Sequence, residues 1–135
     1  MLSGNHNAIP LLAKKPNRIH WGMLSKNKEA LTIINRYPCN IDWSTLSFNP
    51  KAINLLQKNE QMINWTNLSE NDEAVVLLAE NQDMISWNQL SLNKNAVDTF
   101  LFNNQHKINW KLLSRNVGIF EIDYSFLKKR INTFK

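Results

Sequence analysis

Tryptophan recurs at a nearly constant interval along this chain, and this spacing constrains the fold more than any other feature. The five tryptophans lie at Trp21, Trp43, Trp65, Trp87 and Trp110, at intervals of 22, 22, 22 and 23 residues. Each is preceded by isoleucine two residues earlier and followed by leucine, serine and asparagine three, four and six residues later. A fixed period of roughly 20–50 residues is the signature of a tandem-repeat architecture.

The Leu-Ser-x-Asn segment of each unit predicts the start of a helix. Its asparagine is a good N-cap residue, whose side chain accepts hydrogen bonds from free backbone N–H groups. Apolar residues then follow at helical spacing, as in Ala52, Ile53, Leu55 and Leu56. We expect a helix of about nine residues, ended by an asparagine in the left-handed conformation or by proline. The capping positions are Asn27, Asn49, Asn71, Asn93 and Asn116, and the ending positions are Pro16, Pro38, Asn59, Asn81 and Asn103.

The Ile-x-Trp-x-x-Leu segment predicts a second, shorter helix in each unit. The residue before tryptophan is a favourable cap in four of five units, namely Asp42, Asn64, Ser86 and Asn109, and is His20 in the first. Helices this short are unstable alone, but stacked units can bury a continuous core. The tryptophans are expected to form an internal ladder between the helices. The sequence therefore predicts an all-α fold, an α-solenoid of 22-residue units with a longer and a shorter helix each.

The prediction places the whole chain, residues 1–135, in a single repeat domain. Its units span about 2–23, 24–45, 46–67, 68–89 and 90–112, and a degenerate capping unit spans 113–135 with Tyr124 in the tryptophan position. A one-residue insertion falls in the segment 102–106. A leucine-rich repeat is the alternative, but its strand needs alternating apolar residues, and here the alternation stops after Ile-x-Trp.

The unit resembles short tandem repeats found in proteins of giant DNA viruses of amoebae and algae (Mimivirus-like, nucleocytoplasmic large DNA viruses). Residues 46–68 are the most similar segment, and the resemblance covers residues 2–127. Proline follows the cap only at Pro50, so the units are diverged. The resemblance implies a viral protein of the host cytoplasm, virus factory or virion, and it implies no particular activity.

The residues offer little chemistry beyond the repeat. His6, His20 and His106 occupy different positions of the unit, and Cys39 is the only cysteine, so we expect no metal site and no disulfide. No phosphate-binding loop, nucleophile elbow or paired acid and base is found in the sequence. We therefore expect no catalytic residues and no cofactor. A secretory signal and an apolar stretch long enough for a membrane span are also not expected.

The charge of the chain is unevenly distributed. The net charge is +5, but residues 1–58 carry +6, residues 59–98 carry −6 and residues 99–135 carry +5. A candidate basic surface in the first units comprises Lys14, Lys15, Arg18, Lys26, Lys28 and Arg36. Such a surface could bind nucleic acid, but the acidic middle opposes a continuous groove for phosphates.

Four apolar residues occupy positions of the longer helices that are expected to face solvent. They are Val76, Ala79, Leu101 and Phe102, and an exposed apolar patch is a candidate contact surface. The alternative is that the nearby insertion turns them inward. The leading functional hypothesis is a non-enzymatic scaffold that binds a viral or host protein, such as a virion component. The alternatives are a nucleic-acid-binding accessory protein and a self-assembling repeat protein.

Overall fold

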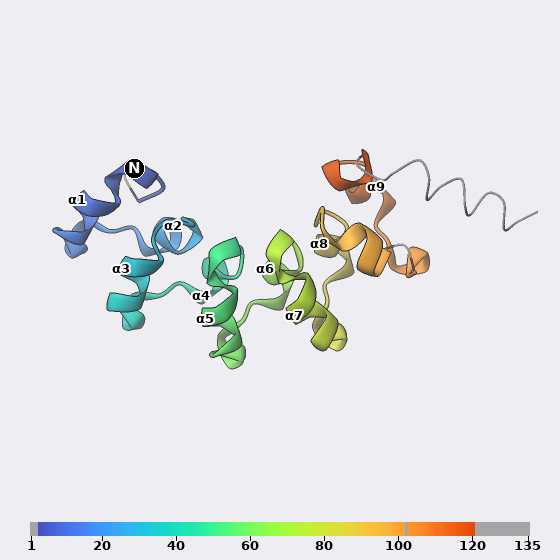
Figure 1. Cartoon of the computed structure of the whole chain (residues 1–135), viewed down its shortest axis with the longest axis horizontal. Helices are drawn as coiled ribbons and strands as arrows, with labels where there is room; N and C mark the ends of the chain where they lie inside the picture. The colour runs from blue at the N-terminus through green and yellow to red at the C-terminus, as the bar shows by residue number, and fades with distance from the viewer. Residues whose placement is uncertain (1–2, 102, 121–135) are drawn as a thin grey trace, which may run out of the picture.

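The computed structural model describes residues 3–101 and 103–120 of the chain. Within these ranges the secondary structure is helical throughout, with no β-strand. The units follow one another along an arc, with α2, α4, α6 and α8 toward its inner side and α3, α5 and α7 toward its outer side (Figure 1). This arrangement confirms the all-α repeat fold and is incompatible with the strands of a leucine-rich repeat.

Every helix is short. The α-helices are α1 (Ile9–Ala13), α2 (Trp21–Lys26), α3 (Leu31–Arg36), α4 (Trp43–Leu46), α5 (Ile53–Gln57), α6 (Trp65–Ser69), α7 (Val75–Glu80), α8 (Trp87–Leu90) and α9 (Trp110–Leu113). The 3₁₀ helices are His6–Ala8, Pro16–Arg18, Pro38–Asn40, Pro50–Ala52, Glu60–Met62, Asp72–Ala74, Gln82–Met84, Gln105–Lys107 and Val117–Phe120, and Val97–Leu101 is a π-helix. None of these described helices has the length and apolar character needed to cross a membrane.

The longer helix of a typical unit is composite. In the third unit a 3₁₀ turn (Pro50–Ala52) leads into α5, and Pro50 occupies the first helical position as predicted. A second 3₁₀ turn, such as Glu60–Met62, precedes the Ile-x-Trp segment where the sequence predicted only a loop. Pro16 and Pro38 begin such turns rather than simply ending the helix before them.

One hydrophobic core runs through all the units. The repeated alanine and leucine positions are almost completely buried, as are the second leucines of the longer helices, because neighbouring units cover both sides of each helix. The apolar residues that are 0% exposed are Leu24, Ala30, Ile34, Leu46, Ala52, Leu56, Leu68, Ala74, Leu78, Leu90 and Ala96. Alanine suits its position because a larger side chain would separate the stacked units.

The capping asparagine performs a second task that joins the units. The Asn49 Oδ1 atom accepts a hydrogen bond from the Lys51 backbone N–H at 3.0 Å, which confirms the predicted cap. The Asn49 Nδ2 group donates to the backbone carbonyls of Ser25 and Asn27 in the preceding unit, at 2.9 and 3.1 Å. Each amide therefore fixes the start of its own helix and holds the backbone of the unit before it.

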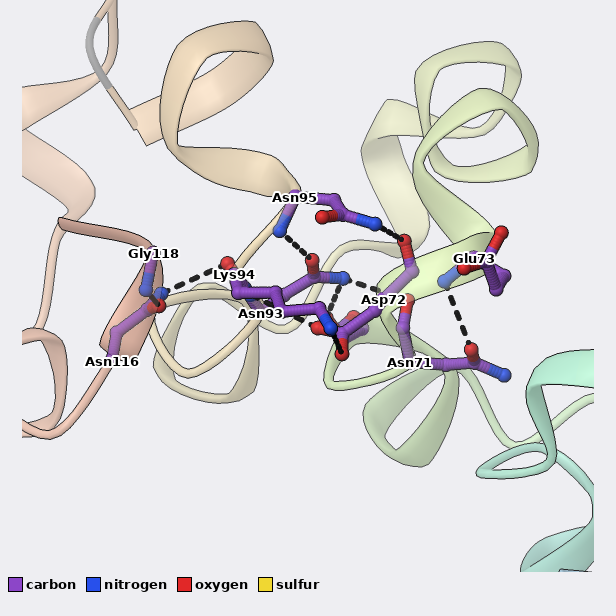
Figure 2. Close-up of polar contacts among 9 residues, drawn as sticks. Asn71, Asp72, Glu73, Asn93, Lys94, Asn95, Asn116 and Gly118 are labelled. Carbon is purple, nitrogen blue, oxygen red and sulfur yellow. Dashed lines mark hydrogen bonds and ion pairs between the residues drawn. The ribbon is translucent and has the colours of Figure 1, made fainter. Parts of the chain in front are cut away.

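The same arrangement recurs along the chain and forms what we call the asparagine spine. It comprises Asn27, Asn49, Asn71, Asn93 and Asn116, all of which are at most 5% exposed. Each amide donates to the Ser carbonyl of the preceding unit, and those of Asn49, Asn93 and Asn116 donate to the preceding Asn carbonyl as well. Figure 2 shows the successive amides of Asn71, Asn93 and Asn116. The Asn carbonyls also accept a backbone N–H, as Asn27 does from Ala30 at 3.0 Å, so a lost amide would leave chiefly the buried Ser carbonyl unsatisfied.

The repeated serine adds a parallel row of hydrogen bonds. The Ser47 Oγ atom accepts from the Asn64 backbone N–H, just before α6, at 3.0 Å and donates to the Trp43 carbonyl, in α4 of the preceding unit, at 2.8 Å. Ser69 and Ser91 repeat both contacts. The invariant Leu-Ser-x-Asn segment is thus the joint between adjacent units.

The helix ends differ from the prediction. No residue in the described ranges has a positive φ angle, so no asparagine there adopts the left-handed conformation. Asn59 has φ −136°, and its Nδ2 group donates to the Leu55 carbonyl at 2.8 Å, thereby closing the end of α5 from the side chain. Asn81 makes the same contact to Leu77. In the fifth unit Asn104, not Asn103, makes it, to the Phe100 carbonyl.

The caps of the short helices also differ in two units. Asp42, Asn64 and Asn109 accept from the backbone N–H three residues later, as predicted. Ser86 forms no such side-chain cap. The unpredicted cap is His20, whose Nδ1 atom accepts from the Met23 N–H at 3.3 Å, because an imidazole nitrogen offers the same lone pair as a carboxylate oxygen.

The tryptophans are not a fully internal ladder. Trp21, Trp43, Trp65 and Trp87 are half-buried against the core, and Trp110 is 62% exposed. Since tryptophan is the first residue of each short helix, one part of the ring packs inward while the rest stays accessible. The Trp21 and Tyr37 rings form a T-shaped contact with centroids 5.7 Å apart, and the Lys107 Nζ atom lies 4.5 Å from the Trp87 ring centroid.

The extra residue of the fifth unit is absorbed in the π-helix Val97–Leu101, not in the segment 102–106. Ala96 keeps the 22-residue spacing from Ala74, but Asn104 follows Asn81 by 23 residues, so the insertion lies between them. The added residue turns Phe100 and Leu101 into the positions of Leu77 and Leu78, and all four are buried. Residues 121–135 of the predicted capping unit, including Tyr124, lie outside the described residues.

Loss of one spine amide should destabilise the whole stack. The Asn49→Ala variant loses two buried hydrogen bonds and one part-buried capping bond, each contributing about 1 kcal/mol, and leaves the Ser25 carbonyl unsatisfied, since the Asn27 carbonyl still accepts from the Ala30 N–H. We expect the free energy of unfolding to fall by about 2–4 kcal/mol in urea titrations followed by circular dichroism. The matched control is Asn54→Ala on the exposed face of α5, which should change stability by less than about 0.5 kcal/mol. Equal effects of the two variants would contradict the role given to the spine.

The π-helix predicts opposite responses to two single-residue deletions. Removing Asp98 should restore an ordinary α-helical turn and keep Phe100 and Leu101 in the core, with a change in stability below about 1 kcal/mol. Removing Val76 from α7 should rotate Leu77 and Leu78 by about 100° out of the core and cost about 3 kcal/mol or more. Thermal unfolding of both variants makes the comparison, and a large loss on removing Asp98 would show that the bulge itself is needed.

Candidate binding groove

The structure separates the residues that the sequence grouped as binding candidates. Val76 is 69% exposed on α7, and Ala79 is also exposed. Leu101 is only 1% exposed, so the expected four-residue apolar patch is wrong at this position. The physical reason is the π-helix, which turns Leu101 inward. Phe102 lies outside the described residues.

The six basic residues are all exposed, but they fall into two groups. Lys14 and Arg36 occupy the same position at the ends of α1 and α3, with Lys15 and Arg18 close by in the chain. Glu80 occupies that position in the fourth unit, so the row of basic residues at this position of the repeat does not continue there. Lys26 and Lys28 lie elsewhere, at the end of α2 and just after it.

Lys26 and Lys28 border a hollow of about 600 Å³ between α2 and α4, which we call the α2/α4 groove. Its other lining residues are Gly4, His20, Gly22, Met23, Asn27, Asp42, Thr45, Phe48 and Pro50. Volumes of roughly 300–1,000 Å³ are typical of ligand sites. The sequence pointed to the two lysines but not to the glycines, Met23 or Phe48.

The groove exists because two glycines replace larger residues of the repeat. Gly22 corresponds to Ser44, Thr66, Asn88 and Lys111 in the later units, and Gly4 corresponds to Lys26, Phe48, Glu70, Leu92 and Arg115. One unit further on, the Ser44 Oγ atom is bonded to the side-chain amides of Asn64 and Asn67, each at 3.0 Å. Between the fourth and fifth units the Asn88 and Asn109 amides join at 3.0 Å. Larger side chains thus occupy this position in the later units, whereas at Gly22 the Asp42 and His20 side chains lie beside the bare backbone.

The walls of the groove combine apolar and charged groups. Met23 is 38% exposed, and a Cβ atom at Gly4 would lie 3.1 Å from its Cε atom. The Lys26 Nζ atom lies 4.8 Å from the centroid of the Phe48 ring. The Asp42 carboxylate caps α4 by accepting from the Thr45 N–H at 3.0 Å, and that helix start offsets part of its charge. The groove therefore offers an apolar floor and two exposed ammonium groups.

Among the described residues, no three His, Cys, Asp or Glu side chains lie close enough together to hold a metal ion. Cys39 is an exposed, free thiol. Comparisons of the whole chain with protein-family models, with curated proteins and with solved structures found no match.

Gly22 and Gly118 should respond differently to an added methyl group. At Gly22 the new Cβ would lie 3.1 Å from the flexible Asp42 Oδ2 atom, so Gly22→Ala should be neutral or should stabilise α2 by up to about 1 kcal/mol. At Gly118 the Cβ would lie 2.4 Å from the Lys94 carbonyl oxygen, so Gly118→Ala should destabilise by about 1–3 kcal/mol. Unfolding midpoints of the two variants test the pair. A marked loss of stability in Gly22→Ala would mean that folding requires a residue without a side chain at this position.

Proposed function

We propose that this chain is a non-enzymatic repeat scaffold that binds a protein partner through the α2/α4 groove. The main support for this proposal is that the groove lies at Gly4 and Gly22, where the other units of the repeat carry larger side chains. The repeated serines and spine asparagines are engaged in joining the units, which supports structural roles for them. Positions that differ between units then carry recognition, as in other solenoid proteins.

The charge and shape of the first units support a protein rather than a long nucleic acid as the partner. A phosphate backbone gains most from a continuous row of cations. Here one position of the repeat is occupied by Lys26, Phe48 and Glu70 in successive units. A second position is occupied by Lys14 and Arg36 in the first two units and by Glu80 in the fourth. The resemblance of the repeat to giant DNA virus proteins favours a viral or host protein of the infected cell.

Nucleic-acid binding is the second candidate, and the register of Lys14, Arg36 and Lys58 in three successive units favours it. It would require affinity that falls steeply with salt and is weakened by reversing Lys14, Lys15 and Arg18. These residues lie away from the groove, so the two functions respond to different substitutions.

The proposal predicts a stoichiometric complex with one protein. Partners captured by the tagged full chain would be purified and mixed with it, and the complex measured by size-exclusion chromatography with light scattering. We expect a defined complex that persists after nuclease treatment and loses affinity at least about tenfold in the Gly22→Asn variant, which places in the groove the side chain that the fourth unit carries at this position, Asn88.

The matched control is Thr66→Asn, the same residue at the corresponding exposed position of α6, which should leave the complex unchanged. A chain that forms no complex with any captured protein would refute the proposed function. Salt-dependent binding of nucleic acid, lost on reversing Lys14, Lys15 and Arg18, would favour the second candidate instead.

A further inference from the structure

We infer that the occupant of the α2/α4 groove is an extended peptide segment that combines one bulky apolar side chain with an acidic residue. This inference rests on the proposed function and specifies the chemistry of the partner. It follows from three properties of the groove: the apolar surface on its floor, the exposed lysines on its border, and the order of charges along the stack.

The floor calls for an apolar side chain. Met23 is 38% exposed and Phe48 is half-buried, while Gly4 and Gly22 contribute no side chain beyond the backbone. Covering apolar surface removes it from water at about 25 cal/mol per Å², so a large aliphatic or aromatic group gains more here than a polar one. The flexible Met23 side chain can adjust to such a group.

The border calls for a carboxylate. The exposed ammonium groups of Lys26 and Lys28 lie beside the hollow, and residues 1–58 carry a balance of +6. The other titratable groups that line the groove are His20 and Asp42. His20 caps α2 through Nδ1, and Asp42 caps α4 through Oδ1, which leaves the Asp42 Oδ2 atom beside Gly22. The two lysines outnumber this one carboxylate and are the cations that recognise an acidic residue.

The stack sets the order of residues in the peptide. Lys26, Phe48 and Glu70 occupy one position in three successive units, and the contact between Lys26 and the Phe48 ring shows that such positions are neighbours. Packed helices lie roughly 9 Å apart, and an extended chain rises about 3.3 Å per residue. One unit is thus spanned by about three residues. The favoured segment carries its acidic, apolar and basic residues at about three-residue intervals.

Other occupants fit these observations less well. A nucleic acid following the row would place phosphates against Glu70 and Asp72 after leaving Lys26 and Lys28. A second copy of the chain would need a protruding apolar group with an acidic neighbour at the right spacing. Both are outcomes that the following experiment detects.

The test uses the full chain and a fluorescein-labelled synthetic peptide in fluorescence anisotropy. The peptide carries aspartate, tryptophan and lysine at three-residue intervals in a serine and glycine background. One comparison peptide replaces tryptophan with alanine, and another replaces aspartate with lysine. We expect each replacement to weaken binding about tenfold or more, since it removes either the anchor or the charge pair.

Charge reversal in the protein supplies the decisive comparison. Lys26→Glu should weaken binding of the aspartate peptide about tenfold and should strengthen binding of the peptide with lysine in its place. Lys111→Glu, the same charge change at an exposed residue of α9, is the matched control and should alter neither affinity by more than about twofold. Circular dichroism confirms that each variant is folded.

Several results would overturn the inference. They are equal affinity for all three peptides, equal effects of Lys26→Glu and Lys111→Glu, stronger binding of single-stranded DNA than of any peptide, and self-association that excludes the peptide. A partner complex that tolerates both Lys26→Glu and Gly22→Asn would refute the peptide chemistry while leaving protein binding intact. Failure to form any protein complex would refute both proposals.

Discussion

The structure depends on one interaction, the hydrogen bonds of a buried asparagine amide with two successive units. Helices of four to six residues cannot stand alone, so the units must hold one another in register. The amide does this because its oxygen caps one helix while its nitrogen reaches the backbone of the unit before. The buried Ser carbonyl makes the arrangement selective as well as stabilising, since a slipped register would leave it unsatisfied, whereas the Asn27 carbonyl also accepts from the Ala30 N–H. The serine row and the small alanine reinforce the same spacing.

Much of this architecture could be predicted because its signals are local. The cap at Asn49, the proline that follows it and the helical spacing of apolar residues each depend on a few neighbouring residues. The inter-unit half of the spine could not be predicted, since the position of the Ser25 carbonyl depends on how two units pack. The same limit explains the error at Leu101. The sequence locates a one-residue insertion in a 22-residue repeat only to within several residues. The structure places the insertion in the π-helix Val97–Leu101, not in the segment after that helix.

The candidate site was only partly visible in the sequence. Lys26 and Lys28 stood out by charge, but they were grouped with Lys14 and Arg36, which the fold places at the ends of other helices. The groove includes Gly22, which has no side chain. The sequence alone does not reveal why this matters, because only the structure shows that the Ser44 and Asn88 side chains form hydrogen bonds at the same position of other units. In a repeat protein, conserved positions build the stack, and a local departure from the repeat marks where a ligand could enter.

The central claim is that the asparagine amides are structural bonds between units, and amide hydrogen exchange of the side chains tests it most directly. In a chain labelled with ¹⁵N at asparagine, the Nδ2 protons of Asn27, Asn49, Asn71, Asn93 and Asn116 should exchange far more slowly than those of exposed residues such as Asn54 and Asn88. The slow set should lose its protection together as urea unfolds the stack. Uniformly fast exchange of all asparagine side chains in the folded protein would contradict the account.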